Sequence, residues 1–234
     1  EMQRSLVGSE MCIRDRETLS GLKAEGVLPD VVQIGNEIRS GLLFPDGELP
    51  DYKQMVQLVN AGIKGARAVA DADEMQVMIH LDQGGRYFYL KEWFDKSFEA
   101  GLDDFDLIGL SYYPFWHGTM EDYRDREGKP LDQLKGMATK PELVEKLDYP
   151  MTKEGQTSFM KDLMELIADI PGGEGFYYWE PAWIPVHGSG WATPASLKYM
   201  NDPGPCGNEW ANQALFDYDG NVLPALEVIR DFRK

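Results

Sequence analysis

The sequence is most informative at VVQIGNEI, residues 31–38. Its first residues are apolar or favour β-structure, and they predict a buried strand over 31–36. The strand ends on an amide and a carboxylate, Asn36 and Glu37, and a carboxylate at a strand end suits general acid/base chemistry. A Glu in this position is more often a surface or salt-bridge residue, so GNE alone leaves both interpretations open.

Buried strands recur along the chain and alternate with helices. Three further apolar runs predict strands, over 75–81, 105–112 and 175–179. The segments around them predict helices, over roughly 17–26, 52–70, 91–100, 153–170 and 223–232. Strands that are apolar throughout and alternate with helices indicate an α/β fold with a parallel sheet.

Polar or aromatic residues stand at the end of each predicted strand. In chain order they are Asn36, Glu37, His80, Asp82, Tyr112, Tyr113, Trp179 and Glu180. The carboxyl ends of parallel strands form the catalytic face of a β/α barrel, so this pattern predicts a site there. A doubly wound sheet also binds ligands at strand ends, but it usually carries a Gly-rich phosphate loop, and the sequence contains none.

Charge and composition narrow the class of partner. The chain has 234 residues, 23 basic against 40 acidic ones, and a formal net charge of −17. Phosphate binding needs a basic face, so nucleic acid is not expected as a partner, and an acidic polymer would be repelled. A neutral substrate fits better, and the 12% of aromatic residues suit stacking on sugar rings as well as core packing. No run approaches the roughly 18 apolar residues of a membrane span, and two cysteines make no disulfide framework.

Six segments carry a resemblance to a known family. They are PDVVQIGNEIRSGLLFPDG, VMIHLD, DLIGLSYYPFWHGT, YPMTKEGQTSFM, GFYYWEPAWIP and WANQALFDYDGNVLPAL. In this order they resemble glycoside hydrolase family 53, the arabinogalactan endo-β-1,4-galactanases, over residues 17–116 and 149–234. The resemblance implies a (β/α)8 barrel, endo-cleavage of β-1,4-galactan and retention of the anomeric configuration.

The resemblance also implies roles for individual residues. It makes Glu37 the acid/base, with Asn36 binding the sugar beside it. The cleft would be lined by His80, Asp82, Tyr112, Tyr113, Trp116, Trp179 and Trp183. No cofactor is required, and the expected partner is β-1,4-galactan or arabinogalactan. The full-length protein is expected to be secreted, periplasmic or at the cell surface, although this chain shows no signal peptide.

The sequence departs from the family pattern at the nucleophile. Counting the GNE strand as the fourth, the first three strands are absent. The strands equivalent to the fourth, fifth, sixth and eighth are present, which predicts a partial (β/α)8 TIM barrel. The family's nucleophilic Glu ends an apolar seventh strand. Residues 120–148 contain no such strand, and the junction between Thr119 and Met120 indicates a deletion.

The other glutamates near this interval are poor replacements. Five follow no strand and are interpreted as solvated charges: Glu121, Glu127, Glu142, Glu145 and Glu154. Glu180 does follow a predicted strand, but the family places Trp179 there as a sugar platform. The sequence therefore predicts an acid/base without an identifiable nucleophile.

The acidic segment EDYRDREG, residues 121–128, raises the question of a structural calcium ion. Asp122 and Asp125 supply two oxygen ligands, whereas calcium takes several. A solvated charge run is the competing interpretation and the better supported one. His117 and His187 are isolated and are not interpreted as metal ligands.

The chain is predicted to contain a tail and one domain. Residues 4–16, RSLVGSEMCIRDR, show no helical or strand period and resemble a translated sequencing adapter, so 1–16 is predicted to be a non-native or disordered tail. Residues 17–234 would form a single incomplete barrel. The predicted function is a retaining endo-β-1,4-galactanase that is inactive because its nucleophile strand is missing. Two alternatives remain, a non-catalytic galactan-binding remnant and another retaining glycanase of the same clan, such as a mannanase or cellulase.

Overall fold

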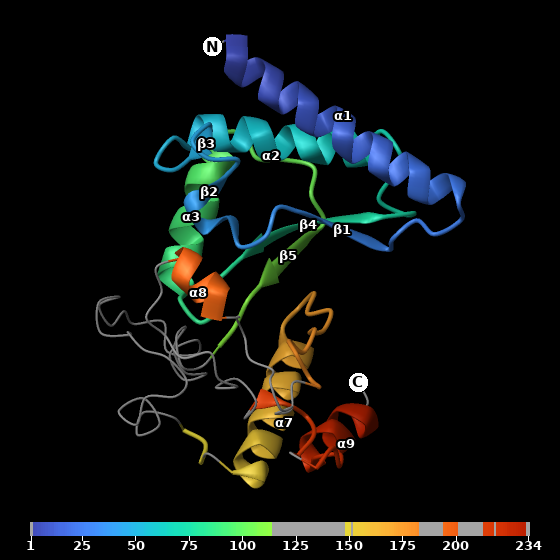
Figure 1. Ribbon diagram of the computed structural model, residues 1–234, viewed down its shortest axis with the longest axis vertical. Coiled ribbons are helices and arrows are strands. Elements are labelled where there is room, and N and C mark those ends of the chain that lie inside the picture. The colour runs from blue at the N-terminus through green and yellow to red at the C-terminus, as the bar shows by residue number, and fades with distance from the viewer. Residues whose placement is uncertain are drawn as a thin grey trace. The chain divides into compact units, whose positions relative to one another are not determined.

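The chain divides into two compact units, residues 1–134 and 135–234, where the sequence predicts one domain over 17–234 (Figure 1). No helix in the described part of the chain is long and apolar enough to cross a membrane. The computed structural model describes residues 2–113, 148–150, 152–182, 194–200, 213–217 and 219–232.

A parallel sheet of three strands forms the centre of the first unit. The strands are β1 (Val31–Ile34), β4 (Gln76–Leu81) and β5 (Leu107–Leu110), in the order β1-β4-β5. Ile34 lies opposite Ile79, and His80 lies opposite Gly109. Three of the four predicted strands and their parallel arrangement are therefore confirmed. Because the strands run in one direction, the residues that follow them meet at one edge of the sheet.

Helices α2 (Tyr52–Arg67) and α3 (Tyr87–Glu99) form as the sequence predicts, and α3 begins four residues earlier than expected. The carboxylate of Asp51 accepts a hydrogen bond from the backbone N–H of Gln54 at 3.0 Å, which caps the start of α2. After α3 the chain turns at Gly101 with φ of 95°, a conformation that glycine adopts without steric cost.

A short connection joins β1 to α2. It consists of a 3-10 helix (Ile38–Ser40) and a small hairpin of β2 (Gly41–Leu42) and β3 (Gly47–Glu48). Ile38 is only 2% exposed, so the residue after Glu37 is anchored in the core.

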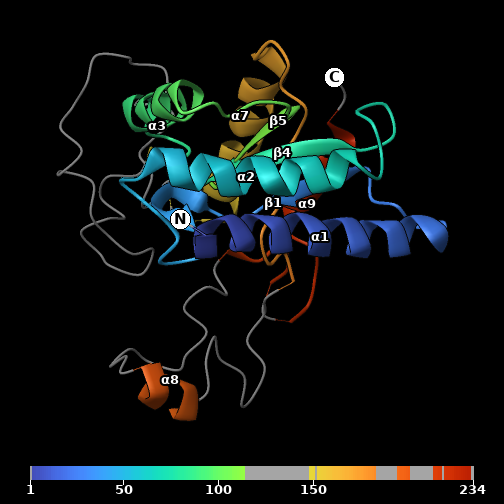
Figure 2. The ribbon, with the colours of Figure 1, turned by 90° about the horizontal axis from the view of Figure 1, so that it is seen from above.

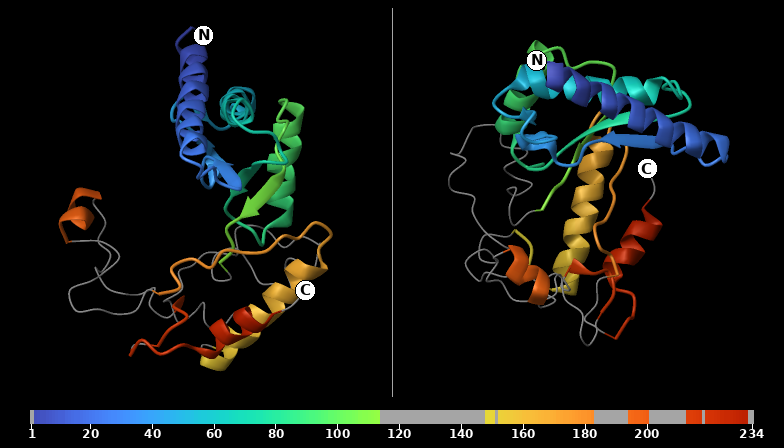
Figure 3. Two further views of the ribbon diagram at one scale, coloured as in Figure 1. Left: turned by 90° about the vertical axis from the view of Figure 1, so that its right-hand side faces the viewer. Right: turned by 45° about the horizontal axis from the view of Figure 1, so that its top comes forward.

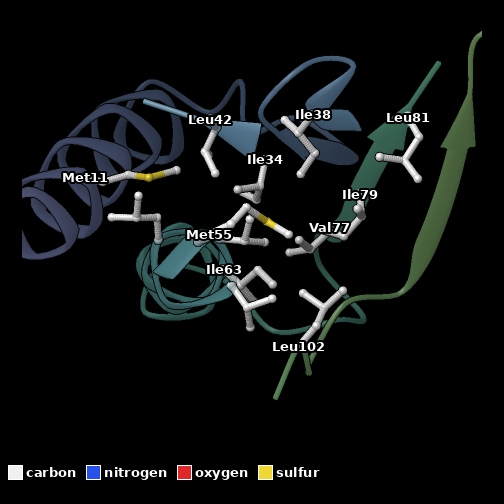
Figure 4. Close-up of a cluster of buried hydrophobic side chains, with 14 of the residues drawn as sticks. Met11, Ile34, Ile38, Leu42, Met55, Ile63, Val77, Ile79, Leu81 and Leu102 are labelled. Atoms are coloured by element: carbon white, nitrogen blue, oxygen red, sulfur yellow. The ribbon is translucent and has the colours of Figure 1, made fainter. Parts of the chain in front are cut away.

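The core of the first unit lies between the sheet and α2 (Figure 4). Val77, Ile79 and Leu81 alternate along β4 and are each 0% exposed. Met55 and Ile63 of α2 belong to the same cluster. Burying one such side chain contributes about 1.5–3 kcal/mol relative to leaving it exposed. The alternation therefore determines which face of β4 meets the helices, and it leaves the residues between these three on the other face.

The N-terminal tract is helical, which corrects the prediction of a disordered tail. Helix α1 (Met2–Ala24) is continuous, and it runs alongside α2 (Figure 2). Met11 is buried in the core, and a Cβ added at Gly65 of α2 would come within 2.7 Å of the carbonyl oxygen of Cys12. The glycine thus lets the two helix backbones approach closely. The non-native origin of residues 1–16 stays a prediction.

The second unit is built around helices α7 (Lys153–Asp169) and α9 (Pro224–Asp231), which lie side by side (Figure 3). The hydroxyl of Thr152 accepts a hydrogen bond from the N–H of Gly155 at 3.1 Å and caps α7, a helix that the sequence predicts over 153–170. The small core of the second unit contains Met160, Leu215 and Ala225. Another helix of this unit is α8 (Pro194–Met200).

The strand predicted over 175–179 is not formed, which corrects the expectation of a fourth strand. These residues are irregular or bent and join no sheet among the described residues. A β-strand forms only when a neighbouring strand pairs with its backbone N–H and C=O groups. The seventh strand, which would be that neighbour, is not identified in the sequence. The segment is instead held by other hydrogen bonds, from the Tyr178 hydroxyl to the carbonyl of Gln213 at 2.6 Å and from the Leu215 N–H to the carbonyl of Pro181 at 2.7 Å.

Candidate active site

The chain makes a tight left-handed turn as it leaves β1. Gly35 has φ of 76°, and Glu37 has φ of 50° and ψ of 48°. A Cβ at Gly35 would collide with Cγ2 of the buried Ile38, so the turn requires glycine. A left-handed conformation costs a residue with a side chain about 1–2 kcal/mol, and such strain concentrates at functional sites. The turn presents the side chains of Asn36 and Glu37 to solvent, where both are exposed.

Gln33 of β1 orients the amide of Asn36. Its Nε2 donates to the carbonyl of Gly35 at 2.7 Å and to Oδ1 of Asn36 at 3.1 Å. This contact orients the amide, and its NH2 group, which carries the donors of the side chain, can donate to a sugar hydroxyl.

His80 connects the ends of all three strands. Its Nδ1 accepts the backbone N–H of Glu37 at 3.1 Å, and its Nε2 lies 3.2 Å from the hydroxyl of Ser111. Burial lowers the pKa of His80, and this effect outweighs the carboxylates of Glu37 and Asp82, which act to raise it. The ring is therefore neutral at pH 7.

Asp82 is held by a cation instead of being free to react. Nε of Arg39 donates to both of its carboxylate oxygens at 3.0 Å, and Nε2 of Gln83 donates to Oδ2 at 2.9 Å. Burial disfavours the charged form of Arg39, yet the Asp82 carboxylate and Tyr89 raise the pKa of Arg39. The side chain of Asp82 is 14% exposed and that of Arg39 is 43% exposed, so the carboxylate is largely removed from water while the guanidinium stays partly solvated.

Tyr112 and Tyr113 complete the set of predicted residues at this edge. Both follow β5 and are half-buried. The neighbouring loops are joined by a hydrogen bond of 2.9 Å from the N–H of Gly84 to the carbonyl of Ser111. The structure thus brings Asn36, Glu37, His80, Asp82 and both tyrosines to one edge of the sheet.

The described part of the second unit contains three residues that the sequence analysis considered, Trp179, Glu180 and Glu154. Trp179 is 66% exposed, which suits a stacking platform, and Glu180 beside it has φ of 51°. Glu154 lies exposed in the first turn of α7, where the helix-terminal backbone and the Thr152 hydroxyl lower its pKa. It is a helix-terminal carboxylate that follows no strand.

Several predicted residues lie outside the described residues. They are Trp116, His117, Glu121, Asp122, Asp125, Glu127, Glu142, Glu145, Trp183 and His187. Among the residues that are described, no group of three or more His, Cys, Asp or Glu side chains could hold a metal ion.

Two contributors to the site were missed in the sequence. Arg39 stands two residues after Glu37, and a cation so close to a candidate acid/base was a usable signal. Ser111 is the first residue of the run SYYP, and its position directly after the predicted strand core was the signal that its hydroxyl lies at the same edge.

The sequence matches known proteins over nearly its whole length. The profile of Glycosyl hydrolase family 53 matches residues 15–229. An "Uncharacterized protein in bgaB 5'region" of Niallia circulans is 34% identical over 262 aligned positions, which cover 98% of this chain and 66% of the relative. The "Endo-beta-1,4-galactanase" of Bacillus subtilis (strain 168) is 32% identical over 259 positions, which cover 92% of this chain and 57% of the relative.

The fold agrees with these matches. The "Ignisphaera aggregans GH53 catalytic domain" superposes with a TM-score of 0.77 and 31% identity, covering 97% of this chain and 65% of that one. The chain spans between about half and two thirds of the length of the curated relatives it matches. A profile match over most of the chain, together with relatives and a solved structure above 30% identity, shows that the chain belongs to glycosyl hydrolase family 53.

Proposed function

We propose that this chain derives from a retaining endo-β-1,4-galactanase and that Glu37 is its acid/base. The observation that carries the proposal is the exposed carboxylate of Glu37 in a strained turn at the carboxyl edge of a parallel sheet, within a family 53 chain. The substrate class is neutral β-1,4-galactan, including the galactan of arabinogalactan. This class fits the net charge of −17, and one curated relative is named an endo-β-1,4-galactanase.

Glu37 supplies one half of the chemistry. In a retaining glycosidase the acid/base protonates the leaving oxygen, and the same group later takes a proton from the water that releases the product. Asn36 donates to a hydroxyl of the sugar bound beside Glu37. Both side chains are exposed, so a polymer can approach them.

The second half is a nucleophilic carboxylate about 5–5.5 Å from the acid/base. Asp82 is the other carboxylate that acts on His80, but Arg39 engages both of its oxygens. A carboxylate bound in this way is stabilised as an anion and is a poor attacking group. We therefore propose that the described part of this edge supplies no nucleophile.

An internal deletion explains the missing group. The alignments with the Niallia circulans and Bacillus subtilis proteins run over 262 and 259 positions, more than the 234 residues of this chain. These relatives therefore contain internal residues that have no counterpart here. The sequence around Thr119 and Met120, where the nucleophile strand is expected, is the proposed place of the loss. Loss of a nucleophile costs several orders of magnitude in rate.

The proposed function makes three further statements. No cofactor is needed, because two carboxylates perform this hydrolysis without one. A calcium ion at Asp122 and Asp125 stays a prediction. The full-length protein is proposed to be exported, because its polymeric substrate lies outside the cell.

The test is reducing-sugar release from β-1,4-galactan by the chain, measured beside affinity electrophoresis in gels that contain galactan. We expect no more than trace release but a measurable retardation in the gel. Trp179→Ala should weaken the retardation, because the indole is an exposed platform, and Tyr199→Ala is the matched control, since Tyr199 is 92% exposed on α8. Robust release that Glu37→Gln abolishes would show that a nucleophile is present and refute the proposed inactivity.

Rescue by azide distinguishes an enzyme that has lost its nucleophile from a remnant that only binds galactan. With an aryl β-galactobioside, azide can attack the anomeric carbon as phenolate leaves, which replaces the missing carboxylate. We expect azide-dependent phenolate release if the remaining site still orients the sugar. Binding without any release would favour the galactan-binding remnant, and turnover of mannan or cellulose in preference to galactan would favour the other clan members.

A further inference from the structure

The imidazole of His80 spans the sheet edge from one neighbouring strand to the other. Nδ1 accepts the backbone N–H of Glu37, which follows β1, and Nε2 meets the hydroxyl of Ser111, which follows β5. One ring therefore contacts the residue proposed as acid/base through its backbone, and a second residue that has no assigned role.

The direction of these hydrogen bonds defines the protonation of the ring. A backbone N–H can only donate, so the Nδ1 that faces Glu37 must carry a lone pair. In the neutral ring the proton then resides on Nε2 and is donated to Oγ of Ser111. A proton on Nδ1 would place two N–H groups face to face and remove the acceptor from Glu37.

The strand beside His80 leaves room for the ring. Gly109 is the register partner of His80 on β5. A Cβ at this position would come within 3.0 Å of Cδ2 of the imidazole. The ring thus passes close to bare backbone on its way to Ser111, and an alanine at Gly109 would collide with Sδ of Met78 and crowd the ring.

We propose that His80 is a positioning residue: its unprotonated Nδ1 holds the backbone of Glu37 in the left-handed turn, and Ser111 keeps the ring proton on Nε2 so that the acceptor stays available. The left-handed conformation is unfavourable for a residue with a side chain, and an accepted N–H is the kind of contact that offsets such a cost. The acid/base role of Glu37 rests on the proposed function, whereas the hydrogen-bond chain does not.

Charged groups around the ring decide when this arrangement holds. The carboxylates of Glu37 and Asp82 act to raise the pKa of His80, Arg39 balances Asp82, and Ser111 is neutral. Burial has the largest effect and lowers the pKa. The arrangement therefore holds at neutral pH and is lost only when acid protonates Nδ1.

The direct test is nitrogen NMR of the imidazole in the full chain. The sequence has three histidines, so His117→Gln combined with His187→Gln leaves His80 as the only one. Above pH 7 we expect Nδ1 to be unprotonated and Nε2 to carry the proton. On acidification, the amide resonance of Glu37 should move with the midpoint of His80, below the ordinary value of 6.5. A dominant Nδ1–H tautomer, or a Glu37 amide that ignores this midpoint, would overturn the proposal.

Two substitutions of His80 separate positioning from packing. In His80→Asn the amide oxygen can take the place of Nδ1, so the Glu37 amide should keep its protection from hydrogen exchange. Its resonance should no longer move with the His80 midpoint, because the titrating ring is gone. In His80→Gln the amide reaches the place of Nε2 instead, and exchange at Glu37 should become about fivefold faster, the factor for one hydrogen bond of about 1 kcal/mol. Equal exchange rates in the two variants would contradict the proposal.

Ser111→Ala tests the other end of the chain. Without the hydroxyl, the Nε2–H loses its acceptor, and the fraction of the Nδ1–H tautomer should rise. An unchanged tautomer ratio would remove Ser111 from the proposal. Circular dichroism checks the fold of each variant, and if one does not fold, the tautomer of His80 in the parent chain decides. None of these measurements uses galactan, so a negative galactan assay and a failed tautomer test have separate meanings.

Discussion

Replacing Gly35 by alanine should strongly destabilise the first unit. Gly35 has φ of 76°, and an alanine there bears the left-handed cost of about 1–2 kcal/mol. Its Cβ would also collide with Cγ2 of Ile38, which is 2% exposed and cannot move into solvent. Forcing an extra methyl group into a packed core costs about 1–3 kcal/mol. We expect a loss of about 2–5 kcal/mol in the free energy of unfolding.

Gly26 offers a matched control for Gly35. It has φ of 72°, but a Cβ there would have no heavy atom within 4 Å. Gly26→Ala should therefore cost only the left-handed term, about 1–2 kcal/mol. The difference between the two variants isolates the collision with Ile38. Combining Gly35→Ala with Ile38→Ala removes the colliding atom, so the double variant should lose about 1–3 kcal/mol less than the two single variants together.

Urea unfolding followed by circular dichroism measures these differences. With a slope of about 2 kcal/mol per molar urea, Gly35→Ala should lower the midpoint by about 1–2.5 M. The Gly26→Ala midpoint should fall by less than about 1 M. Equal losses for both glycine variants, or strict additivity with Ile38→Ala, would refute the packing argument for the GNE turn.

Two further predictions concern charge. Burial alone would raise the pKa of Asp106, but hydrogen bonds from Arg67 and from the Val77 N–H hold this pKa below its usual range. The contribution of Asp106 to the stability of the fold is therefore complete above a pH of about 4, and it is lost as the pH falls through the lowered native pKa. Asp106→Asn should cost about 1.5–3 kcal/mol at pH 7 and little at pH 2 in urea titrations, and a cost independent of pH would contradict this. Asp82→Asn removes a carboxylate that raises the pKa of His80, so the NMR midpoint of His80 should fall further, and a rise would contradict the assignment.

The parallel sheet and most of its edge could be predicted from sequence. The apolar runs identify β1, β4 and β5 as strands, because strands of a parallel sheet are rich in apolar residues. Their burial is predicted less well, because β5 has no buried residue and leaves Ile108 53% exposed. Their shared direction then brings Asn36, Glu37, His80 and Asp82 together without any knowledge of side-chain conformation. What could not be predicted is the partner of each group, because the contact of Arg39 Nε with both oxygens of Asp82 depends on rotamers and loop geometry.

Two predictions failed for the same physical reason. The run GFYYW at 175–179 has strand composition, but composition cannot supply a ladder partner. Residues 4–16 have no helical period, yet they are helical because α2 offers them a surface. In both cases the deciding interaction is with a distant part of the chain, and tertiary contacts override local preference.

The close contact of α1 and α2 bears on where this protein can be cut. The family match begins at residue 15, inside α1. A shortened form that starts there keeps Leu19 but loses Met11, whose Cε would lie 2.8 Å from a Cβ at Gly62. The glycine-lined side of α2 and the adjacent Ile34 would then face water. The boundary of the family profile therefore lies more than half a helix inside the folded unit. Trimming the chain to the residues that the profile matches removes the N-terminal half of the helix that covers this side of α2.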